Sequence, residues 1–121
     1  MDSSGGHLVV RRLEGVIVVQ FGASKIIDEK SVAEIGKKLD RLASAGPSSR
    51  LLLNFENVDQ LSSSALGMLI TLNRGMKMKG GVLKLCGIHP QVFQVFSITR
   101  LDRMFEIFSD EEQALASFNA S

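Results

Sequence analysis

Several residue types are scarce in this chain of 121 residues, and each scarcity excludes a class of protein. Cys86 is the one cysteine, so no disulfide forms within the chain and no second cysteine completes a C-x-x-C metal or redox motif. It ends the apolar run 82–86, where we expect a buried, structural thiol. Trp and Tyr are absent, so the seven Phe residues can fill a core but supply few amphipathic anchors for an interface.

Strong charge of one sign is also lacking, because 14 Lys and Arg residues balance 13 Asp and Glu residues. Basic residues form only short clusters such as Arg11–Arg12, which predicts no direct contact with a nucleic acid. No apolar run approaches the roughly 18 residues that a membrane helix needs. Residues 1–6 lack the pattern of a secretion signal. The sequence therefore predicts a cytoplasmic protein that binds no membrane.

The length of the chain fits one domain, and its 45% of hydrophobic residues are enough for a packed core. Residues 1–6 are small and polar, and we expect them to form a flexible N-terminal tail. The remaining residues, 7–121, show no internal repeat and no linker. We expect them to form a single domain.

The first half of this domain is predicted to contain a hairpin and a helix. Two β-rich runs, 7–13 and 16–21, flank a short turn at Gly15. From Asp28 onward, apolar residues recur at steps of three and four, as in an amphipathic helix. Asp28 is its expected N-cap, and Gly46–Pro47 is its expected stop signal.

Three strand and helix pairs are predicted to follow. The expected strands are 50–55, 82–86 and 104–108. The expected helix starts are Ser62–Ser64, His89–Pro90 and Ser109–Glu112, the last with the spacing of a capping box between Ser109 and Glu112. The resulting order, ββαβαβαβα, predicts an α/β fold with a mixed, mostly parallel sheet of about five strands and four helices.

Residue types that carry catalysis or bind metals do not converge in the sequence. His7 and His89 have no nucleophile near them in the chain. The carboxylates of Asp28–Glu29 and Asp110–Glu112 are placed at helix starts, where the helix dipole stabilises them. No set of residues has metal-ligand spacing, and no glycine-rich loop lies between a strand and a helix. We therefore expect a non-enzyme without metal or cofactor that works by binding other proteins.

A run of three serines, Ser62–Ser64, follows a predicted buried strand and begins a predicted helix. One serine is enough for an N-cap, because its hydroxyl accepts a hydrogen bond from a backbone N–H. The small residues Ala65 and Gly67 follow, so a partner can approach closely. Such a helix start also accommodates a phosphate. Two interpretations stay open at this point: simple capping, or a functional hydroxyl group.

The run from Leu51 to Ile70 resembles the STAS domain, the family of bacterial anti-sigma factor antagonists. Residues 51–55 match the buried strand of the family, and Ser62–Gly67 match its motif Asp-Ser-Ser/Thr-Gly-Leu-Gly. The resemblance continues through Leu101–Phe105 and the acidic Asp110–Glu112 before the last helix. It covers nearly the whole chain after the tail.

The resemblance implies a partner-switching regulator. In the family, the unphosphorylated form binds an anti-sigma factor kinase and frees a sigma factor. The kinase phosphorylates the first hydroxyl residue after the motif Asp, and a phosphatase reverses the reaction. Carried over to this chain, the phosphoacceptor is Ser63, with Ser64 and Ser62 as alternatives. The partner surface that the family implies consists of Lys25, Asp28, Asn57, Asp59, Gln60, Ser62, Ser63, Ser64 and Met68.

Three departures from the family pattern keep a second interpretation open. Ser62 replaces the motif Asp, Ala65 replaces the Gly, and Gly22–Ser24 stand where the family carries an acid that helps form the phosphorylation site. The alternative is a non-phosphorylated adaptor, such as a scaffold subunit of a signalling complex or of a transporter. Met68 is predicted either to be a partly exposed contact or to pack under the third helix. A homodimer and a small hydrophobic ligand also stay open.

Overall fold

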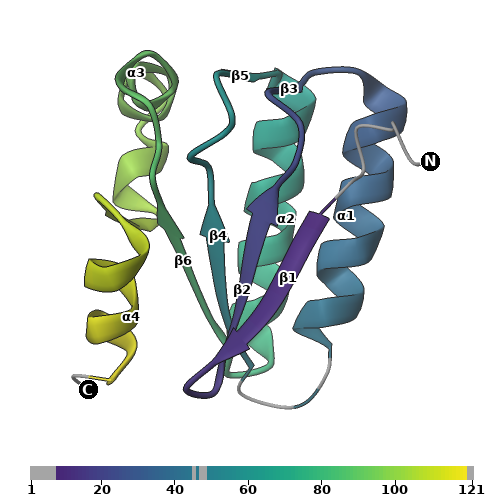
Figure 1. Cartoon of the computed structure of the whole chain (residues 1–121). Coiled ribbons are helices and arrows are strands. Elements are labelled where there is room, and N and C mark those ends of the chain that lie inside the picture. Colours follow the sequence, from purple (N-terminus) through teal and green to yellow (C-terminus); the bar gives the residue numbers. More distant parts are fainter. Residues whose placement is uncertain (1–7, 45, 47–48, 120–121) are drawn as a thin grey trace.

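The computed structural model describes residues 8–44, 46 and 49–119. Its main sheet has five strands in the order β1-β2-β4-β6-β7, and a separate pair joins β3 to β5. The strands of the main sheet are β1 (Leu8–Leu13), β2 (Val16–Phe21), β4 (Arg50–Asn54), β6 (Val82–Cys86) and β7 (Glu106–Phe108). The α-helices are α1 (Glu29–Ala43), α2 (Ser63–Met78), α3 (Pro90–Ile98) and α4 (Glu111–Asn119). The predicted order of these elements is confirmed (Figure 1).

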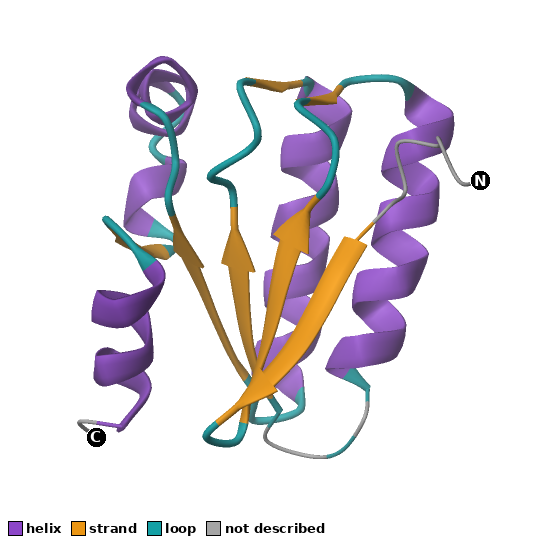
Figure 2. Ribbon diagram, viewed as in Figure 1, coloured by secondary structure: helices purple, strands orange, loops and turns teal. Residues whose placement is uncertain are grey.

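The sheet is mixed, as predicted, because only β1 runs against its neighbour. The β1–β2 hairpin closes with Leu13 opposite Val16. Glu14 and Gly15 form its two-residue turn with φ of 53° and 80°, the left-handed conformation that tight hairpin turns require. The other four strands are parallel, so their carboxyl ends meet at one edge of the sheet (Figure 2).

The two faces of the sheet are covered unequally. Side chains of a strand point alternately to either face, so Ile17 and Val19 pack in the large core with α1 and α2. Val18 and Leu52 pack on the opposite face against Phe118 of α4. Figure 1 shows α1 and α2 together behind the sheet and α4 by itself at the left, beside β6. Helix α4 contacts β4, β6 and β7, and its Glu111 pairs with Arg11 of β1.

Helix starts follow the predicted caps with one exception. Asp28 caps α1, because its Oδ2 accepts a hydrogen bond of 3.0 Å from the Ser31 N–H, which lowers the pKa of Asp28. The capping box at Ser109 is wrong. The residue that caps α4 is Asp110, whose Oδ1 accepts a bond of 2.9 Å from the Gln113 N–H. A carboxylate at this position also interacts with the helix dipole, so it caps in preference to the preceding serine.

Other differences concern short elements and element ends. The predicted strand 104–108 is shorter, because a 3-10 turn (Leu101–Arg103) precedes it and the strand begins at Glu106. The strands β3 (Lys25–Ile26) and β5 (Gln60–Leu61) were not predicted, since two residues show no periodicity. Helix α1 ends at Ala43, before the expected stop signal. The predicted tail 1–6, as well as His7 and Pro47, lies outside the described residues.

Candidate functional site

The loop after β2 and the loop after β4 run side by side at the carboxyl edge of the sheet (Figure 1). Strands β3 and β5 pair in parallel, with Lys25 opposite Gln60. The Asp59 N–H donates a bond of 2.8 Å to the carbonyl oxygen of Ser24. The Ser62 N–H donates one of 3.0 Å to the carbonyl oxygen of Ile26. The two segments that the sequence predicts as one surface are therefore joined by their backbones at the start of α2.

The first turn of α2 presents two exposed serines. Ser62 is the N-cap, because its Oγ accepts a bond of 3.1 Å from the Ala65 N–H. Ser63 and Ser64 are the first residues of the helix, and both are exposed. The first turn contains no acidic residue. The open backbone N–H groups and the helix dipole at this position favour a negative charge on either hydroxyl.

The remaining predicted residues of the two loops differ in exposure. Lys25, Asp28 and Gln60 are exposed. Asn57 is exposed as well, and its Nδ2 donates a bond of 3.3 Å to the carbonyl oxygen of Phe21. Asp59 is half-buried, and its Oδ1 has no hydrogen-bond partner among the described residues. The backbone of Asp59 is bonded to Ser24, which belongs to the segment where the sequence lacks the acid of the family.

Met68 does not pack under α3, which was one of its two predicted places, and its role as a partly exposed contact stays a prediction. It is half-buried, and its Cγ lies 3.1 Å from the position that a Cβ on Gly36 of α1 would take. Met68 therefore faces α1 rather than α3. It lines a groove of about 360 Å³ between the two helices. The reason is that α1 lies alongside α2, so α1 partly covers the flank of α2 that carries Met68 (Figure 2).

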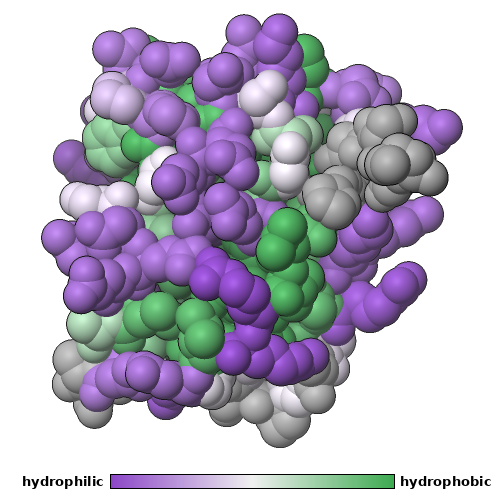
Figure 3. Space-filling model, in the orientation of Figure 1, coloured by the Kyte–Doolittle hydropathy of each residue, from purple (hydrophilic) through white to green (hydrophobic). Residues whose placement is uncertain are grey.

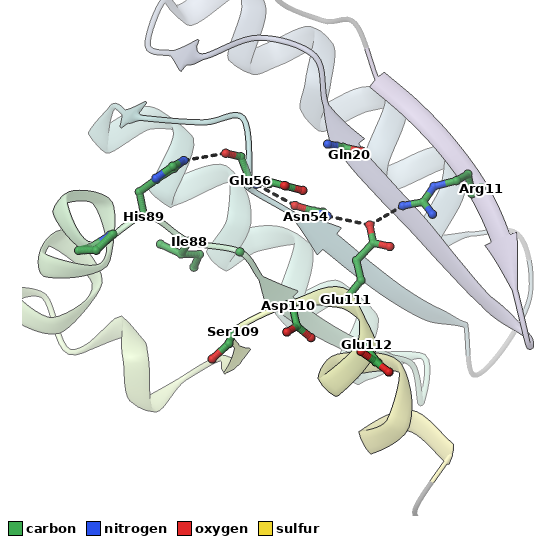
Figure 4. Close-up of a pocket in the computed structure, with 12 residues that line it drawn as sticks. Arg11, Gln20, Asn54, Glu56, Ile88, His89, Ser109, Asp110, Glu111 and Glu112 are labelled. Carbon is green, nitrogen blue, oxygen red and sulfur yellow. Dashed lines mark hydrogen bonds and ion pairs between the residues drawn. The ribbon is translucent and has the colours of Figure 1, made fainter.

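A second hollow, which the sequence analysis missed, opens on the α4 side of the sheet edge (Figure 4). Its volume is about 720 Å³. Open α/β sheets bind ligands outside the carboxyl ends of their strands, and this hollow has that position. The residues that line it come from five separate elements and their loops: Arg11, Gln20, Asn54, Glu56, Gly87, Ile88, His89, Pro90, Ser109, Asp110, Glu111 and Glu112. Because these residues are scattered along the chain, no continuous sequence motif indicates the hollow.

A hydrogen-bond network crosses this hollow. The buried Asn54 donates from Nδ2 to Glu111 Oε2 at 2.7 Å, and Arg11 pairs with the same oxygen. Asn54 Oδ1 accepts a bond of 2.7 Å from the Glu56 N–H. His89 Nε2 and the Glu56 carbonyl oxygen are 2.6 Å apart and form a hydrogen bond. Figure 4 shows the side chains of Arg11, Asn54 and Glu111 converging from β1, β4 and α4, and His89 pointing toward the backbone of Glu56.

The network positions loops and offers no obvious nucleophile. His89 is engaged with backbone, and Glu111 is engaged with Arg11 and Asn54. Cys86 at the end of β6 is fully buried, and burial raises its pKa to about 12, so the thiolate form is suppressed at neutral pH. Within the described residues, no group of three or more His, Cys, Asp or Glu side chains has a geometry that could hold a metal ion.

Comparison with known proteins identifies the family. The sequence model of the STAS domain matches residues 7–114. The chain belongs to the STAS family. This STAS domain is 22% identical over 101 residues to an anti-sigma F factor antagonist of Paenibacillus polymyxa, covering 84% of this chain and 85% of that protein. It is 29% identical over 94 residues to an anti-sigma-B factor antagonist of Bacillus subtilis (strain 168), covering 78% and 84%.

The fold comparison agrees with the sequence comparison. A solved anti-sigma-factor antagonist (STAS) domain protein of Planctomyces limnophilus superimposes on this STAS domain with a TM-score of 0.84. The identity is 21%, and the match covers 93% of this chain and 98% of the other. The family prediction made from residues 51–70 is thus confirmed, as is the predicted fold class. In the described part of the chain, no helix is long and apolar enough to span a bilayer.

Proposed function

We propose that this STAS domain is an anti-sigma factor antagonist that binds an anti-sigma factor of the serine-kinase type. Its contact area is the α2 docking surface, which we define as Lys25, Asp28, Asn57, Asp59, Gln60 and Ser62–Ser64. The observation that carries this proposal is the β3–β5 pairing, because it holds both loops against the start of α2. Membership of a family whose named relatives are such antagonists supports the same role.

The proposed control is phosphorylation of Ser63, reversed by a phosphatase. Ser62 Oγ is already engaged in capping, whereas Ser63 is the first exposed hydroxyl of the helix, with Ser64 as the alternative. A phosphate adds about −1.5 to −2 charges at neutral pH. At the centre of an interface this charge would be desolvated or repelled. A coupling of about 2–4 kcal/mol changes affinity roughly thirtyfold to a thousandfold, which is enough for a switch.

In this role the chain is the substrate of a kinase and acts by binding, not by catalysis. The role also places it in the cytoplasm with its partners. Met68 is not part of the α2 docking surface as defined here, because it faces α1. A partner that reaches around α2 could still contact it through the groove between the two helices.

One observation favours a second candidate function. Ser62 caps α2 without bringing a negative charge, and the first turn of α2 contains no acidic residue. If the kinase needs the acid that the family places here, this chain is a constitutive adaptor in a signalling complex or a transporter. Ser62–Ser64 are then a helix cap and a contact surface only.

The deciding experiment combines phosphosite mapping with binding. The protein is purified from its native cells as wild type and as Ser63→Ala, and intact mass and phosphopeptides are measured. Calorimetry then compares Ser63→Ala and Ser63→Glu for binding to the anti-sigma factor kinases of the same organism. Ser97→Glu is the matched control, since Ser97 is an exposed serine on α3 and is not one of the residues that define the α2 docking surface.

A phosphate on Ser63, together with a loss of at least about thirtyfold in affinity for Ser63→Glu and none for Ser97→Glu, supports the switch. Tight binding without any phosphate under growth or stress conditions supports the adaptor instead. Absence of binding to every anti-sigma factor kinase of the organism overturns the antagonist function.

A further inference from the structure

A further hollow, which we call the Asp59 hollow, lies between the β3–β5 pair and α3. Its volume is about 380 Å³, at the lower end of the range for ligand pockets, so it accommodates one long side chain better than a large cofactor. At this upper end of the molecule, Figure 3 shows apolar and hydrophilic surface side by side. The residues that line the hollow are Ile27, Asp59, Gln60, Leu61, Gln91, Val92 and Val95.

The carboxylate of Asp59 lacks a donor. Its Oδ1 is almost completely covered, yet no described residue donates a hydrogen bond to this oxygen. A carboxylate oxygen that is withdrawn from water is costly without a donor, and buried polar atoms are therefore nearly always paired. The last side-chain torsion of an aspartate rotates easily, so either oxygen can turn toward a donor that enters the hollow. A ligand that supplies such a donor removes the cost.

The charge of the hollow has one sign. Among the described residues that line it, Asp59 is the one ionisable group, and none is Lys or Arg. Lys25 is opposite Gln60 in the β3–β5 pair but does not line the hollow. Gln60 and Gln91 are exposed, and their amide oxygens can accept further hydrogen bonds. The hollow therefore presents acceptors to a cationic donor and no positive charge that repels it.

The rest of the wall is aliphatic. Val92 is buried, Leu61 and Val95 are half-buried, and Ile27 is 46% exposed. Long basic side chains bury their methylene groups along apolar surface of this kind and keep the charged head at polar groups. An apolar wall beside one unpaired carboxylate thus matches a ligand with an aliphatic stem and a cationic head.

We propose that the Asp59 hollow binds an arginine side chain of the protein that docks on the α2 docking surface. This inference rests on the proposed function, because Asp59 and Gln60 belong to that surface and a partner seated there covers the hollow. The guanidinium donates two parallel hydrogen bonds to the Asp59 carboxylate, and its remaining N–H groups face the glutamine amides. Arginine is also one of the residues that most often dominate the affinity of an interface.

A lysine side chain is a poorer occupant of the same hollow. Its ammonium group is compact and strongly hydrated, so it loses more on leaving water than a guanidinium does. It also cannot donate two parallel hydrogen bonds to one carboxylate. The chemistry of Asp59 therefore selects arginine over lysine.

The first test needs no partner protein. The full chain labelled with ¹⁵N is titrated to millimolar concentrations with the methyl ester of acetyl-arginine and with the corresponding lysine and citrulline esters. Citrulline has the shape of arginine without its charge. We expect the arginine ester to shift the amide resonances of residues 59–61 and 91–95, the lysine ester to bind more weakly, and the citrulline ester to shift none of them. Equal shifts with the citrulline ester overturn the proposal, as do arginine-induced shifts confined to other residues.

Two pairs of variants locate the site. Asp59→Asn removes the charge and keeps the shape, so it should weaken binding of the arginine ester at least about tenfold. Asp102→Asn is its control, because Asp102 is a half-buried aspartate that does not line the hollow. Gln91→Lys supplies a competing cation and should also weaken binding, whereas Gln94→Lys changes an exposed glutamine of α3 outside the hollow and should not. Unchanged affinity in Asp59→Asn and Gln91→Lys overturns the proposal.

The second test uses an anti-sigma factor kinase that binds the wild-type chain. Asp59→Asn should weaken this binding at least about tenfold, and Asp102→Asn should leave it unchanged. Wild-type affinity of Asp59→Asn for the kinase overturns the arginine anchor and leaves the antagonist function intact. If no kinase of the organism binds while the arginine ester still fills the hollow, the arginine site is supported and the antagonist function is overturned.

Discussion

Asn54 and Glu111 are joined side chain to side chain by a hydrogen bond of 2.7 Å, although 57 positions separate them in the sequence. Asn54 ends β4, and Glu111 is the first residue of α4. Through its other side-chain atom, Asn54 also holds the backbone N–H of Glu56, which leads toward the α2 docking surface. One buried amide therefore ties the start of α4 to the loop that precedes α2.

Replacing this amide should be strongly destabilising. Asn54→Ala removes the hydrogen-bond partner of the Glu56 N–H and one partner of the Glu111 carboxylate. We expect this variant to lower the free energy of unfolding by about 2–3 kcal/mol. Equilibrium denaturation in urea measures the loss. Asn57→Ala is the control, because Asn57 is exposed and makes a single bond of 3.3 Å, so we expect a loss below about 1 kcal/mol. Equal losses in the two variants would contradict the structural role of Asn54.

A side chain at Gly87 should destabilise the protein, whereas a side chain at Gly75 should stabilise it. Gly87 has φ of 70°, and a Cβ there would lie 3.0 Å from Asn54 Oδ1, so Gly87→Ala should cost about 1–3 kcal/mol. Gly75 lies within α2 and a Cβ there meets nothing within 4 Å. Gly75→Ala should therefore stabilise the protein by about 0.5–1 kcal/mol. Thermal and urea unfolding compare the pair, and a stabilised Gly87→Ala would refute the argument.

Substitutions at Ser62 and Ser63 should separate the capping of α2 from the proposed signalling role. Ser62→Ala removes the hydroxyl that caps α2 and should lower the unfolding free energy by about 1 kcal/mol. Ser62→Asp keeps a capping oxygen and adds a charge that the helix dipole favours, so we expect it to be at least as stable as the wild type. Ser63→Ala should stay within about 0.5 kcal/mol. Urea titrations of the three variants check these values, and a large loss in Ser63→Ala would mean that Ser63 has a structural role as well.

Cys86 should be unreactive in the folded protein and should make stability depend on alkaline pH. Burial raises the pKa of Cys86 from 9.0 to about 12. Because the folded state holds this proton more tightly than the unfolded state, the contribution to stability is complete below pH 9 and falls as the pH rises toward 12. A thiol reagent at pH 8 should label the chain only when denaturant is added. Rapid labelling without denaturant would show that β6 opens readily, and Cys86→Ala should have a flatter stability profile above pH 9.

Long elements with regular patterns could be predicted from the sequence, because burial of one face imposes its own periodicity. The stripe of α1 is of this kind, whereas the apolar run of β4 is continuous because both of its faces are buried. The two-residue strands β3 and β5 are held by pairing between distant loops, so no local pattern reveals them. At the start of α4, Ser109 and Asp110 are adjacent and both residue types are good caps, so the local pattern does not select between them, although the helix dipole favours Asp110.

The candidate site was predictable to a similar degree. The serines of α2 form a contiguous motif, so both the helix start and its exposure could be expected. The orientation of Met68 could not, because it depends on which helix lies beside α2. The hollow around Asn54 was missed for the same reason. Arg11, Asn54 and Glu111 come from separate elements, and only the parallel arrangement of the strands brings them together.

The pairing of β3 with β5 has a consequence for how this chain can diversify. Two residues on each side set the register of both loops. Backbone bonds from the Asp59 and Ser62 N–H groups to the carbonyl oxygens of Ser24 and Ile26 extend this register to the helix start. An insertion or deletion in either loop would shift the other and would displace the cap of α2. Surface loops usually acquire new partners through changes in length, and the β3–β5 pairing excludes such changes in these two loops. Relatives with other partners should differ at this edge by amino-acid replacement at constant spacing, and engineered changes of specificity should keep that spacing too.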